Sequence, residues 1–287
     1  MSLKKILHDQ VLVICTRNRH QRLQELFINL SECSSLPYLV IVVDSSEMPL
    51  KDEDLLTLQT NLGVTVRYVL SDSGLPFQRN IGLDEISQIT TYSEIKVCHF
   101  LDDDVSIRSE YFDVVARIYG ELNPVALGSF DINLPNPSVS PIRKLLGLAG
   151  DRQGQLLKSG IAIAPALVGQ PTEVDWLPGH SVAYRWPLVR DLGFNSSLRM
   201  YGEDVDVCMR LRKYGKLFVH PEAYVWHSPE VAGRDASADV QSFSSGFRWK
   251  LAKDYPSFVS KRWALITTAA LIVGGLYESV RGRMSSS

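Results

Sequence analysis

The first half of the chain alternates between short apolar runs and longer segments with helical spacing. The apolar runs are rich in β-branched residues and have the length of buried strands. The segments between them place apolar residues three or four positions apart, as Leu23, Leu26 and Leu30 do. This alternation predicts βαβ units and a mostly parallel sheet. The predicted strands are Val11–Cys15, Tyr38–Val43, Val64–Leu70 and Ile95–Leu101, and the predicted helices are Arg19–Leu30, Leu50–Leu62, Pro76–Ile89 and Tyr111–Leu122.

Polar clusters follow three of the predicted strands. Thr16–Arg19 follows the first strand, Asp44–Ser46 the second, and Asp102–Asp104 the fourth. The carboxyl ends of parallel strands meet at one edge of a sheet, and open α/β sheets bind their ligands there. We therefore expect the three clusters to converge on a single site.

The three consecutive aspartates are chemically the most informative of these clusters. Adjacent carboxylates repel one another, and a fold that gathers them commonly offsets the repulsion with a cation. Oxygen ligands in a short cluster suit Mg²⁺ or Mn²⁺, and such a metal typically bridges the phosphates of a nucleotide. In an extended segment Asp102 and Asp104 lie on the same side, so these two are the expected ligands. The alternative is a solvated acidic turn.

The second half of the chain is less regular. Residues 123–175 are rich in Pro, Gly and Ser, so we expect loops there. Regular patterning returns with a predicted helix at Glu203–Tyr214 and short strands at Leu217–His220 and Ala223–His227. The first turn of that helix holds three acids, which also suit a helix N-terminus by charge alone.

Composition narrows the class of protein. The 287 residues carry a formal net charge of −2, so no overall basic field indicates a nucleic-acid partner. The four cysteines are scattered and form no Cys-x-x-Cys pair, which argues against a zinc site and favours a reducing cytoplasm. The first ten residues lack the apolar stretch of a secretory signal.

Six segments form an ordered set of motifs: Val13–Arg19, Val42–Ser46, Arg79–Gly82, Phe100–Asp104, Gly202–Asp206 with Arg210-Leu211, and Pro221–His227. In this order they resemble glycosyltransferase family 2, inverting enzymes with the GT-A fold, over about residues 10–230. The resemblance implies an α/β fold with a mostly parallel, Rossmann-like central sheet flanked by helices. We expect a GT-A domain at 8–235, with a nucleotide-binding half at 8–105 and an acceptor half at 106–235. A helical extension, basic and apolar in character, is expected at 236–287.

The resemblance also implies roles for single residues. Asp102 and Asp104 match the metal motif, and His227 matches a position that can complete the metal shell in related enzymes. Asp204 matches the general base that takes the proton of the acceptor hydroxyl, with Glu203 as the alternative base or an orienting partner. The residues expected at the nucleotide-sugar are Thr16, Arg17, Asp44, Arg79, Asp102 and Asp103.

Structural alternatives to these roles stay open. Asp44 also suits a turn at a strand end, Arg79 an ion pair with an aspartate, and His227 a buried, hydrogen-bonded position. Asp206 is expected to cap its helix or to pair with an arginine. Gly82 is expected to serve close packing.

The predicted function is metal-dependent, inverting transfer of one sugar from a nucleotide-diphosphate donor to an acceptor hydroxyl, in polysaccharide or glycan biosynthesis. Mg²⁺ or Mn²⁺ is the expected cofactor, and a glycan or a lipid-linked glycan the expected acceptor. The Gln-x-x-Arg-Trp motif of polymer synthases is missing, which argues for single additions. A sugar nucleotidyltransferase would carry a Gly-rich phosphate loop, which is absent at Cys15–Arg19. A non-catalytic sugar- or lipid-binding adaptor is the other alternative.

Residues 247–283 combine basic and aromatic positions with the apolar stretch Trp263–Tyr277. These fifteen residues are too few for a bilayer-spanning helix, which needs about 20. Two interpretations remain: contact with a membrane interface, or packing on the protein or across a homodimer. The first predicts a cytoplasmic protein that lies peripherally at the inner face of the cell membrane.

Overall fold

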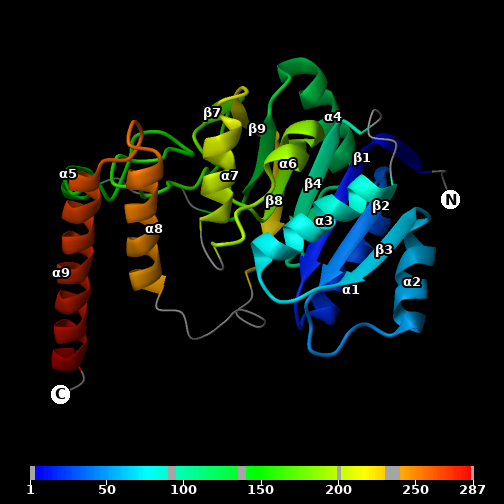
Figure 1. Cartoon of the computed structure of the whole chain (residues 1–287), viewed down its shortest axis with the longest axis horizontal. Helices are drawn as coiled ribbons and strands as arrows, with labels where there is room; N and C mark the ends of the chain where they lie inside the picture. The colour runs from blue at the N-terminus through cyan, green and yellow to red at the C-terminus, as the bar shows by residue number, and fades with distance from the viewer. Residues whose placement is uncertain (1–3, 90–94, 135–139, 199–201, 230–239, 286–287) are drawn as a thin grey trace. The chain divides into compact units, whose positions relative to one another are not determined.

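The computed structural model describes residues 4–89, 95–134, 140–198, 202–229 and 240–285 (Figure 1). Its strands are β1 (Lys5–Thr16), β2 (Ser35–Asp44), β3 (Thr65–Leu70), β4 (Val97–Asp102), β5 (Val105–Ile107), β6 (Ala126–Asp131), β7 (Thr172–Val174), β8 (Ser181–Arg185) and β9 (Leu217–His227). Its helices are α1 (His20–Ser31), α2 (Asp52–Leu62), α3 (Leu75–Ile89), α4 (Tyr111–Leu122), α5 (Pro141–Leu145), α6 (Trp186–Leu192), α7 (Glu203–Leu211), α8 (Val240–Asp254) and α9 (Lys261–Ser285).

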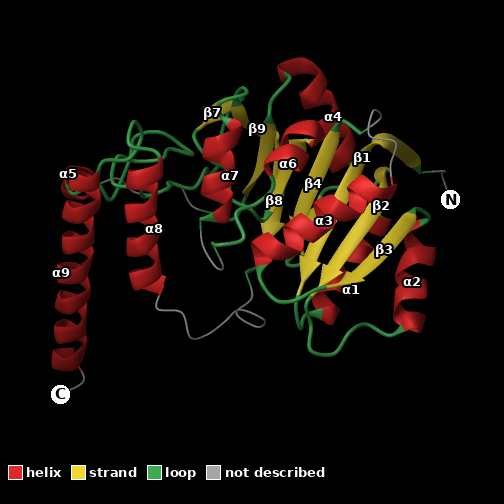
Figure 2. Ribbon diagram, in the orientation of Figure 1, coloured by secondary structure: helices red, strands yellow, loops and turns green. Residues whose placement is uncertain are grey.

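The strands form one sheet in the order β3-β2-β1-β4-β8-β6-β9-β5, with β7 beside β9. The four strands β3, β2, β1 and β4 are mutually parallel, as the alternation of strands and helices predicts. Beyond β4 the sheet is mixed, because β8 runs antiparallel to both of its neighbours while β6 and β9 are parallel. The predicted α/β fold class is confirmed, and Figure 2 shows the sheet with its covering helices.

Alternate residues of β1 face opposite sides of the sheet. Leu12 and Ile14 belong to a core cluster that also contains buried residues of α1 and α4. Val13 faces α3, where a Cβ atom at Gly82 would lie only 2.5 Å from Val13 Cγ1. The predicted role of Gly82 in close packing is therefore confirmed, and this contact brings α3 against the strands that carry the polar clusters.

Strand β1 begins earlier than its apolar run indicates. Lys5–Leu7 pairs in register with Ser35–Pro37, and the register then shifts before Val11. The intervening polar residues His8–Gln10 interrupt the apolar pattern. A pattern of buried positions therefore detects only the second half of this strand.

The chain divides into two compact units. The first contains residues 1–136 and 165–235, and the second contains residues 137–164 and 236–287. The second unit includes α5, α8 and α9. This unit thus combines residues 137–164, which the sequence analysis assigned to the acceptor half, with the predicted extension at 236–287. The predicted boundary at 235/236 lies outside the described residues.

Among the described residues, none of the helices combines the length and the apolar character that crossing a membrane requires.

Candidate functional site

Three strand ends bring polar residues together at one edge of the sheet. Thr16, at the end of β1, pairs in register with Asp44 at the end of β2, and Cys15 pairs with Asp102 at the end of β4. Because these three strands are parallel, their carboxyl ends share this edge. The predicted convergence of the three polar clusters is confirmed.

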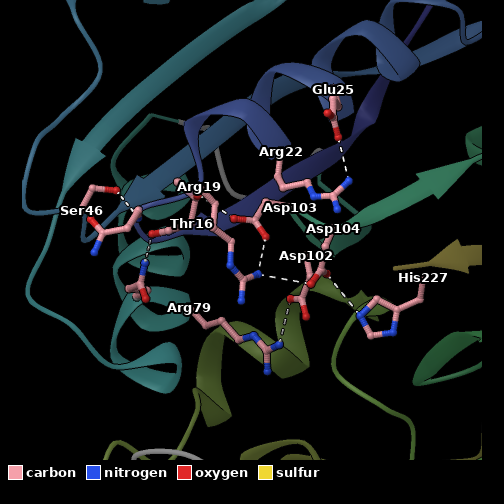
Figure 3. A network of polar contacts seen from close by, with 12 residues as sticks. Thr16, Arg19, Arg22, Glu25, Ser46, Arg79, Asp102, Asp103, Asp104 and His227 are labelled. Atoms are coloured by element: carbon pink, nitrogen blue, oxygen red, sulfur yellow. Dashed lines mark hydrogen bonds and ion pairs between the residues drawn. The ribbon is translucent and has the colours of Figure 1, made fainter. Parts of the chain in front are cut away.

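The turn after β4 is held by residues from the end of β1. Buried Asp103 accepts a hydrogen bond from Thr16 Oγ1 at 2.7 Å. Arg19 Nη1 donates to Asp103 Oδ1 at 2.8 Å and to Asp104 Oδ2 at 3.2 Å, as Figure 3 shows. The arginine that binds Asp103 and Asp104 is thus Arg19, which the sequence analysis did not single out. Contact of Arg17 with a nucleotide-sugar stays a prediction.

Asp102, Asp104 and His227 form a group suited to a metal ion. One ligand atom of each residue lies within 4.8 Å of the other two. His227 Nε2 lies 3.2 Å from Asp104 Oδ1 (Figure 3). Carboxylates suit Mg²⁺ or Mn²⁺, and an imidazole favours the transition metal of the two. The residues present therefore fit the divalent ion that the resemblance implies, and they are the three ligands that the sequence predicts.

The electrostatics of this group favour an added positive charge. Removal from water raises the pKa of Asp102 to about 6, an effect that Arg79 opposes and the charges of Asp104 and Asp103 reinforce. Burial alone would lower the pKa of His227, but its contact with Asp104 and the charges of Asp102 and Asp131 together outweigh burial, and the net shift is upward. The carboxylates thus repel one another in a poorly hydrated place, which a cation would relieve.

His180 supports the imidazole of His227. The two rings stack, with centroids 4.5 Å apart and an angle of 27° between their planes. The carbonyl oxygen of His180 accepts a hydrogen bond from the backbone N–H of Asp102 at 2.9 Å. Burial, reinforced by the charge of His227, lowers the pKa of His180 to about 3, so the His180 ring is neutral. His180 therefore connects two of the three candidate ligands.

Arg79 is a buried cation between two parts of the site. This residue of α3 is 2% exposed. Its Nη1 donates to Glu203 Oε1 at 3.2 Å, its Nη2 donates to the carbonyl oxygen of Gly179 at 2.9 Å, and Nη2 also lies 3.6 Å from Asp102 Oδ1. Burial alone would lower the pKa of Arg79, but Glu203 and Asp102 outweigh burial and raise it. Arg79 is thus a permanent charge that joins β4 to the first turn of α7.

Glu203 and Asp204 begin α7 and have different partners. Glu203 is buried against Arg79. Asp204 is only partly buried, and its carboxylate accepts hydrogen bonds from the backbone N–H groups of Val205 at 2.7 Å and Gly179 at 3.3 Å. Burial raises the pKa of both acids. Asp204 is therefore the more accessible carboxylate of the two, and no side-chain cation is hydrogen-bonded to it among the described contacts.

Two other acids have partners within the protein. Asp206 accepts a hydrogen bond from Arg210 Nε at 2.9 Å, which confirms the predicted pairing with an arginine. Asp44 is fully buried, and its carboxylate accepts hydrogen bonds from the Tyr68 hydroxyl and from the backbone N–H of Ser46. Asp44 thus fixes the turn after β2, and its contact with a nucleoside stays a prediction.

The architecture is shared with solved glycosyltransferase structures. GalNAc-T7 with UDP, GalNAc and Mn²⁺ aligns at a TM-score of 0.64 and 17% identity, over 87% of this chain and 50% of that chain. TarS 1–349 from S. aureus in complex with UDP-GlcNAc aligns at a TM-score of 0.60 and 17% identity, over 86% and 66% of the two chains. Mannosyltransferase PcManGT from Pyrobaculum calidifontis in complex with GDP-Man and Mn²⁺ aligns at a TM-score of 0.55 and 12% identity, over 99% and 81%. The fold is the GT-A glycosyltransferase fold.

The chain is also similar in amino-acid sequence to a known glycosyltransferase. A stretch of 92 residues is 34% identical to the rhamnosyltransferase WbbL of Escherichia coli (strain K12). The match covers 32% of this chain and 33% of WbbL, so the chain aligns with about a third of that relative. No protein-family model matches the chain. The predicted resemblance and the predicted GT-A fold are confirmed.

Two residues of this GT-A site were missed by the sequence analysis, Arg19 and Gly179. Asn18 has a φ of 55°, in the left-handed region, and this turns the chain between Arg17 and Arg19. At Gly179, a Cβ atom would lie 2.7 Å from Arg79 Nη2, so any larger residue would require the guanidinium to shift. An asparagine between two arginines, and a Pro-Gly pair ahead of a strand, are the sequence signals for these features.

Proposed function

We propose that the chain is a metal-dependent, inverting glycosyltransferase that moves one sugar from a nucleotide-diphosphate donor to an acceptor hydroxyl. The observation that carries this proposal is the continuous set of contacts from Asp102 through Arg79 and Gly179 to Asp204. These contacts connect the side chains that we propose for the metal with the carboxylate that we propose as the general base. The two carboxylate sites have different surroundings, which suits two different tasks.

Asp102, Asp104 and His227 would hold the divalent ion. When bound, Mg²⁺ or Mn²⁺ supplies charge stabilisation to the departing nucleoside diphosphate. Arg19 and Thr16 hold the turn that carries these carboxylates, so the ligands are positioned before a metal arrives.

Asp204 would act as the general base. In the proposed step the acceptor oxygen forms a bond to the anomeric carbon while the bond from that carbon to the phosphate oxygen breaks. The bonding electrons leave with the diphosphate, and the hydroxyl proton passes to the carboxylate of Asp204. One direct displacement of this kind inverts the anomeric configuration. Glu203 would orient the turn through Arg79, because its carboxylate is engaged in that ion pair.

The donor would bind along the strand ends. The solved neighbours bear UDP, UDP-GlcNAc or GDP-Man in their names, and two of them also bear Mn²⁺. These names support a nucleotide-diphosphate sugar as the donor without selecting the sugar. The residues that we propose at the donor are Thr16, Arg17, Asp44, Arg79, Asp102 and Asp103.

The acceptor would be a glycan or a lipid-linked glycan, in a polysaccharide or related pathway. The rhamnosyltransferase relative supports sugar transfer as the class of reaction. A cytoplasmic location is supported by the four cysteines, which are all buried and free of disulfides. A homodimer stays a prediction.

A donor panel tests this proposal. UDP-, GDP- and dTDP-sugars are incubated with the purified chain and Mn²⁺, and release of nucleoside diphosphate is measured with and without chelator. We expect turnover of one donor group, loss of turnover on chelation and in Asp104→Asn, and a product of inverted anomeric configuration by NMR. An absence of turnover with every donor, with donor binding unchanged by Asp104→Asn, would instead favour a non-catalytic adaptor.

A further inference from the structure

Positive charge is concentrated in the second compact unit. Residues 137–164 and 236–287 together hold eleven Lys and Arg against four Asp and Glu, a formal net charge of +7. The whole chain carries −2, so the first unit carries −9. The excess of positive charge in the second unit is therefore hidden in the net charge of the whole chain.

Helix α9 of this unit exposes apolar side chains along one face. Leu265 is 58% exposed, Ile272 is 55% exposed and Val273 is 67% exposed, and Ile266 and Ala269 are exposed between them. Positions 265, 266, 269, 272 and 273 recur every three or four residues, so they form one continuous stripe. A soluble helix normally places such a stripe against a core. Here the stripe faces outward.

The opposite face of α9 is fixed within the unit. Thr267 is fully buried, and its Oγ1 donates to the carbonyl oxygen of Leu146 at 2.8 Å. Arg248 of α8 donates through Nη2 to Thr268 Oγ1 at 2.9 Å. These contacts set the rotation of α9 about its axis. The exposed apolar stripe is therefore a consequence of how the unit packs.

Helix α5 adds a second apolar and basic element beside the start of α9. Ile142 and Leu145 are both exposed, and Arg143 and Lys144 lie between them. The hydrogen bond from Thr267 to the residue after α5 keeps this helix at the N-terminal end of α9, as Figure 1 shows. That end also carries the exposed basic residues Lys261 and Arg262. Exposed apolar and cationic side chains therefore adjoin one another there.

We propose that the second unit binds the surface of an anionic lipid bilayer through α5 and the apolar stripe of α9. The stripe supplies side chains that enter the interfacial layer, and Arg143, Lys261 and Arg262 pair with anionic headgroups, whereas Lys144 is ion-paired with Asp151. A second copy of this chain is the competing occupant of the stripe. It would bring one unit of charge +7 against another, which opposes that association.

This inference goes beyond the proposed transfer reaction and does not depend on it. Flotation of the full chain with vesicles measures it without any sugar donor. Vesicles of phosphatidylglycerol and phosphatidylcholine in equal parts are compared with vesicles of phosphatidylcholine alone. We expect binding to the first and at least ten-fold weaker binding to the second, with a progressive loss of binding as salt is added.

Matched variants test whether vesicle binding depends on the apolar stripe of α9 or on any exposed apolar side chain. Leu265→Gln combined with Ile272→Gln should lower vesicle binding at least ten-fold, because both side chains are exposed and fixed outward. Leu56→Gln is the control, since Leu56 on α2 of the first unit is 66% exposed and should leave binding unchanged. Arg143→Gln and Arg262→Gln should each weaken binding roughly five-fold. Thermal melts of every variant verify that it folds.

Three results would overturn the proposal. One is equal binding to anionic and neutral vesicles, and another is absence of binding to both. The third is a stable dimer of the wild-type chain by analytical ultracentrifugation that dissociates in the Leu265→Gln, Ile272→Gln variant, which would assign the stripe to a second copy. If the wild-type chain binds anionic vesicles but turns over no donor, that result counts against the proposed glycosyltransferase function and leaves the membrane proposal standing.

Discussion

Arg79 and Glu203 form a buried ion pair across 124 positions of the sequence, with Nη1 and Oε1 3.2 Å apart. The pair joins α3, which packs on the parallel strands, to the first turn of α7, which carries the candidate base. Because the same guanidinium also contacts Asp102 and the carbonyl group of Gly179, the two halves of the site share one cation. Movement of either half would disturb the other.

Removal of this cation should destabilise the protein strongly. Arg79→Ala leaves Glu203 buried without its partner, and loss of one partner of a buried pair costs about 3–5 kcal/mol. Urea unfolding measures the change. Arg117→Ala is the control, because Arg117 forms half-exposed pairs with Glu121 and Glu222, each of which contributes less than about 1 kcal/mol. Equal losses in the two variants would contradict the role of burial.

A methyl group at Gly179 should impair turnover more than stability. The new Cβ would lie 2.7 Å from Arg79 Nη2, so the guanidinium must shift away from the Gly179 carbonyl oxygen. We expect Gly179→Ala to lower kcat at least ten-fold while the folded state persists. The control is Gly120→Ala in α4, where nothing lies within 4 Å of the added atom and the change should stabilise the helix by about 0.5–1 kcal/mol. Full activity in Gly179→Ala would show that the position of Arg79 is unimportant.

The pH dependence of turnover should report Asp204. A general base acts in its ionised form, so activity falls as the pH drops through its pKa. Burial raises the pKa of Asp204, and the acid limb of kcat/KM should therefore lie above the ordinary aspartate value of 3.8. Asp204→Asn should remove turnover, whereas Asp206→Asn, in the same helical turn, should keep the position of the limb. A limb that is unchanged in an active Asp204→Asn enzyme would assign the base elsewhere.

Buried His99 should make the fold sensitive to acid. Burial lowers the pKa of His99 from 6.5 to about 3, and Nε2 lies 2.7 Å from Gln10 Oε1. Between these two pH values the unfolded chain binds a proton that the native state does not. The contribution of His99 to the free energy of unfolding is therefore fully present above pH 6.5. It is lost as the pH falls below that value, with a limiting slope of about 1.4 kcal/mol per pH unit.

His180 is shifted in the same direction, so the free energy of unfolding over that pH range is compared between wild type and variants to separate the effect of His99. His99→Gln should flatten the slope, whatever its effect on absolute stability. His8→Gln, at an exposed position, should preserve it. An identical slope in wild type and His99→Gln would mean that other groups cause the acid sensitivity.

The parallel half of the fold was predictable because its signals are local. Each strand there is an apolar run followed by a helix with a clear buried face, and the strand-end rule then located Thr16, Asp44 and Asp102. The mixed half was not predictable in the same way. Strands β6 and β8 are short, fully or almost fully buried and separated by a segment that folds with the other unit. Their pairing depends on contacts between distant parts of the chain, which a local pattern does not contain.

In the candidate site, too, the sequence indicated individual residues, but their contacts follow only from the fold. The aspartate cluster indicated Asp104 and the family resemblance implied His227, but only the fold shows that their side chains lie 3.2 Å apart. Whether Arg17 or Arg19 contacts the aspartates depends on the left-handed backbone conformation of Asn18, which composition does not specify. The membership of residues 137–164 in the second unit follows from contacts such as Leu146 with Thr267, across 121 positions.

The central claim is that the carboxylates after β4 bind a nucleoside diphosphate through a divalent ion. Calorimetric titration of UDP, GDP and dTDP into the protein, with and without Mn²⁺, tests it most directly. We predict that one nucleotide binds at least about ten-fold more tightly with Mn²⁺, that Asp104→Asn removes this gain, and that Asp113→Asn on the surface of α4 retains it. Nucleotide affinity that is the same with and without Mn²⁺, or that is unaltered in Asp104→Asn, would contradict the account.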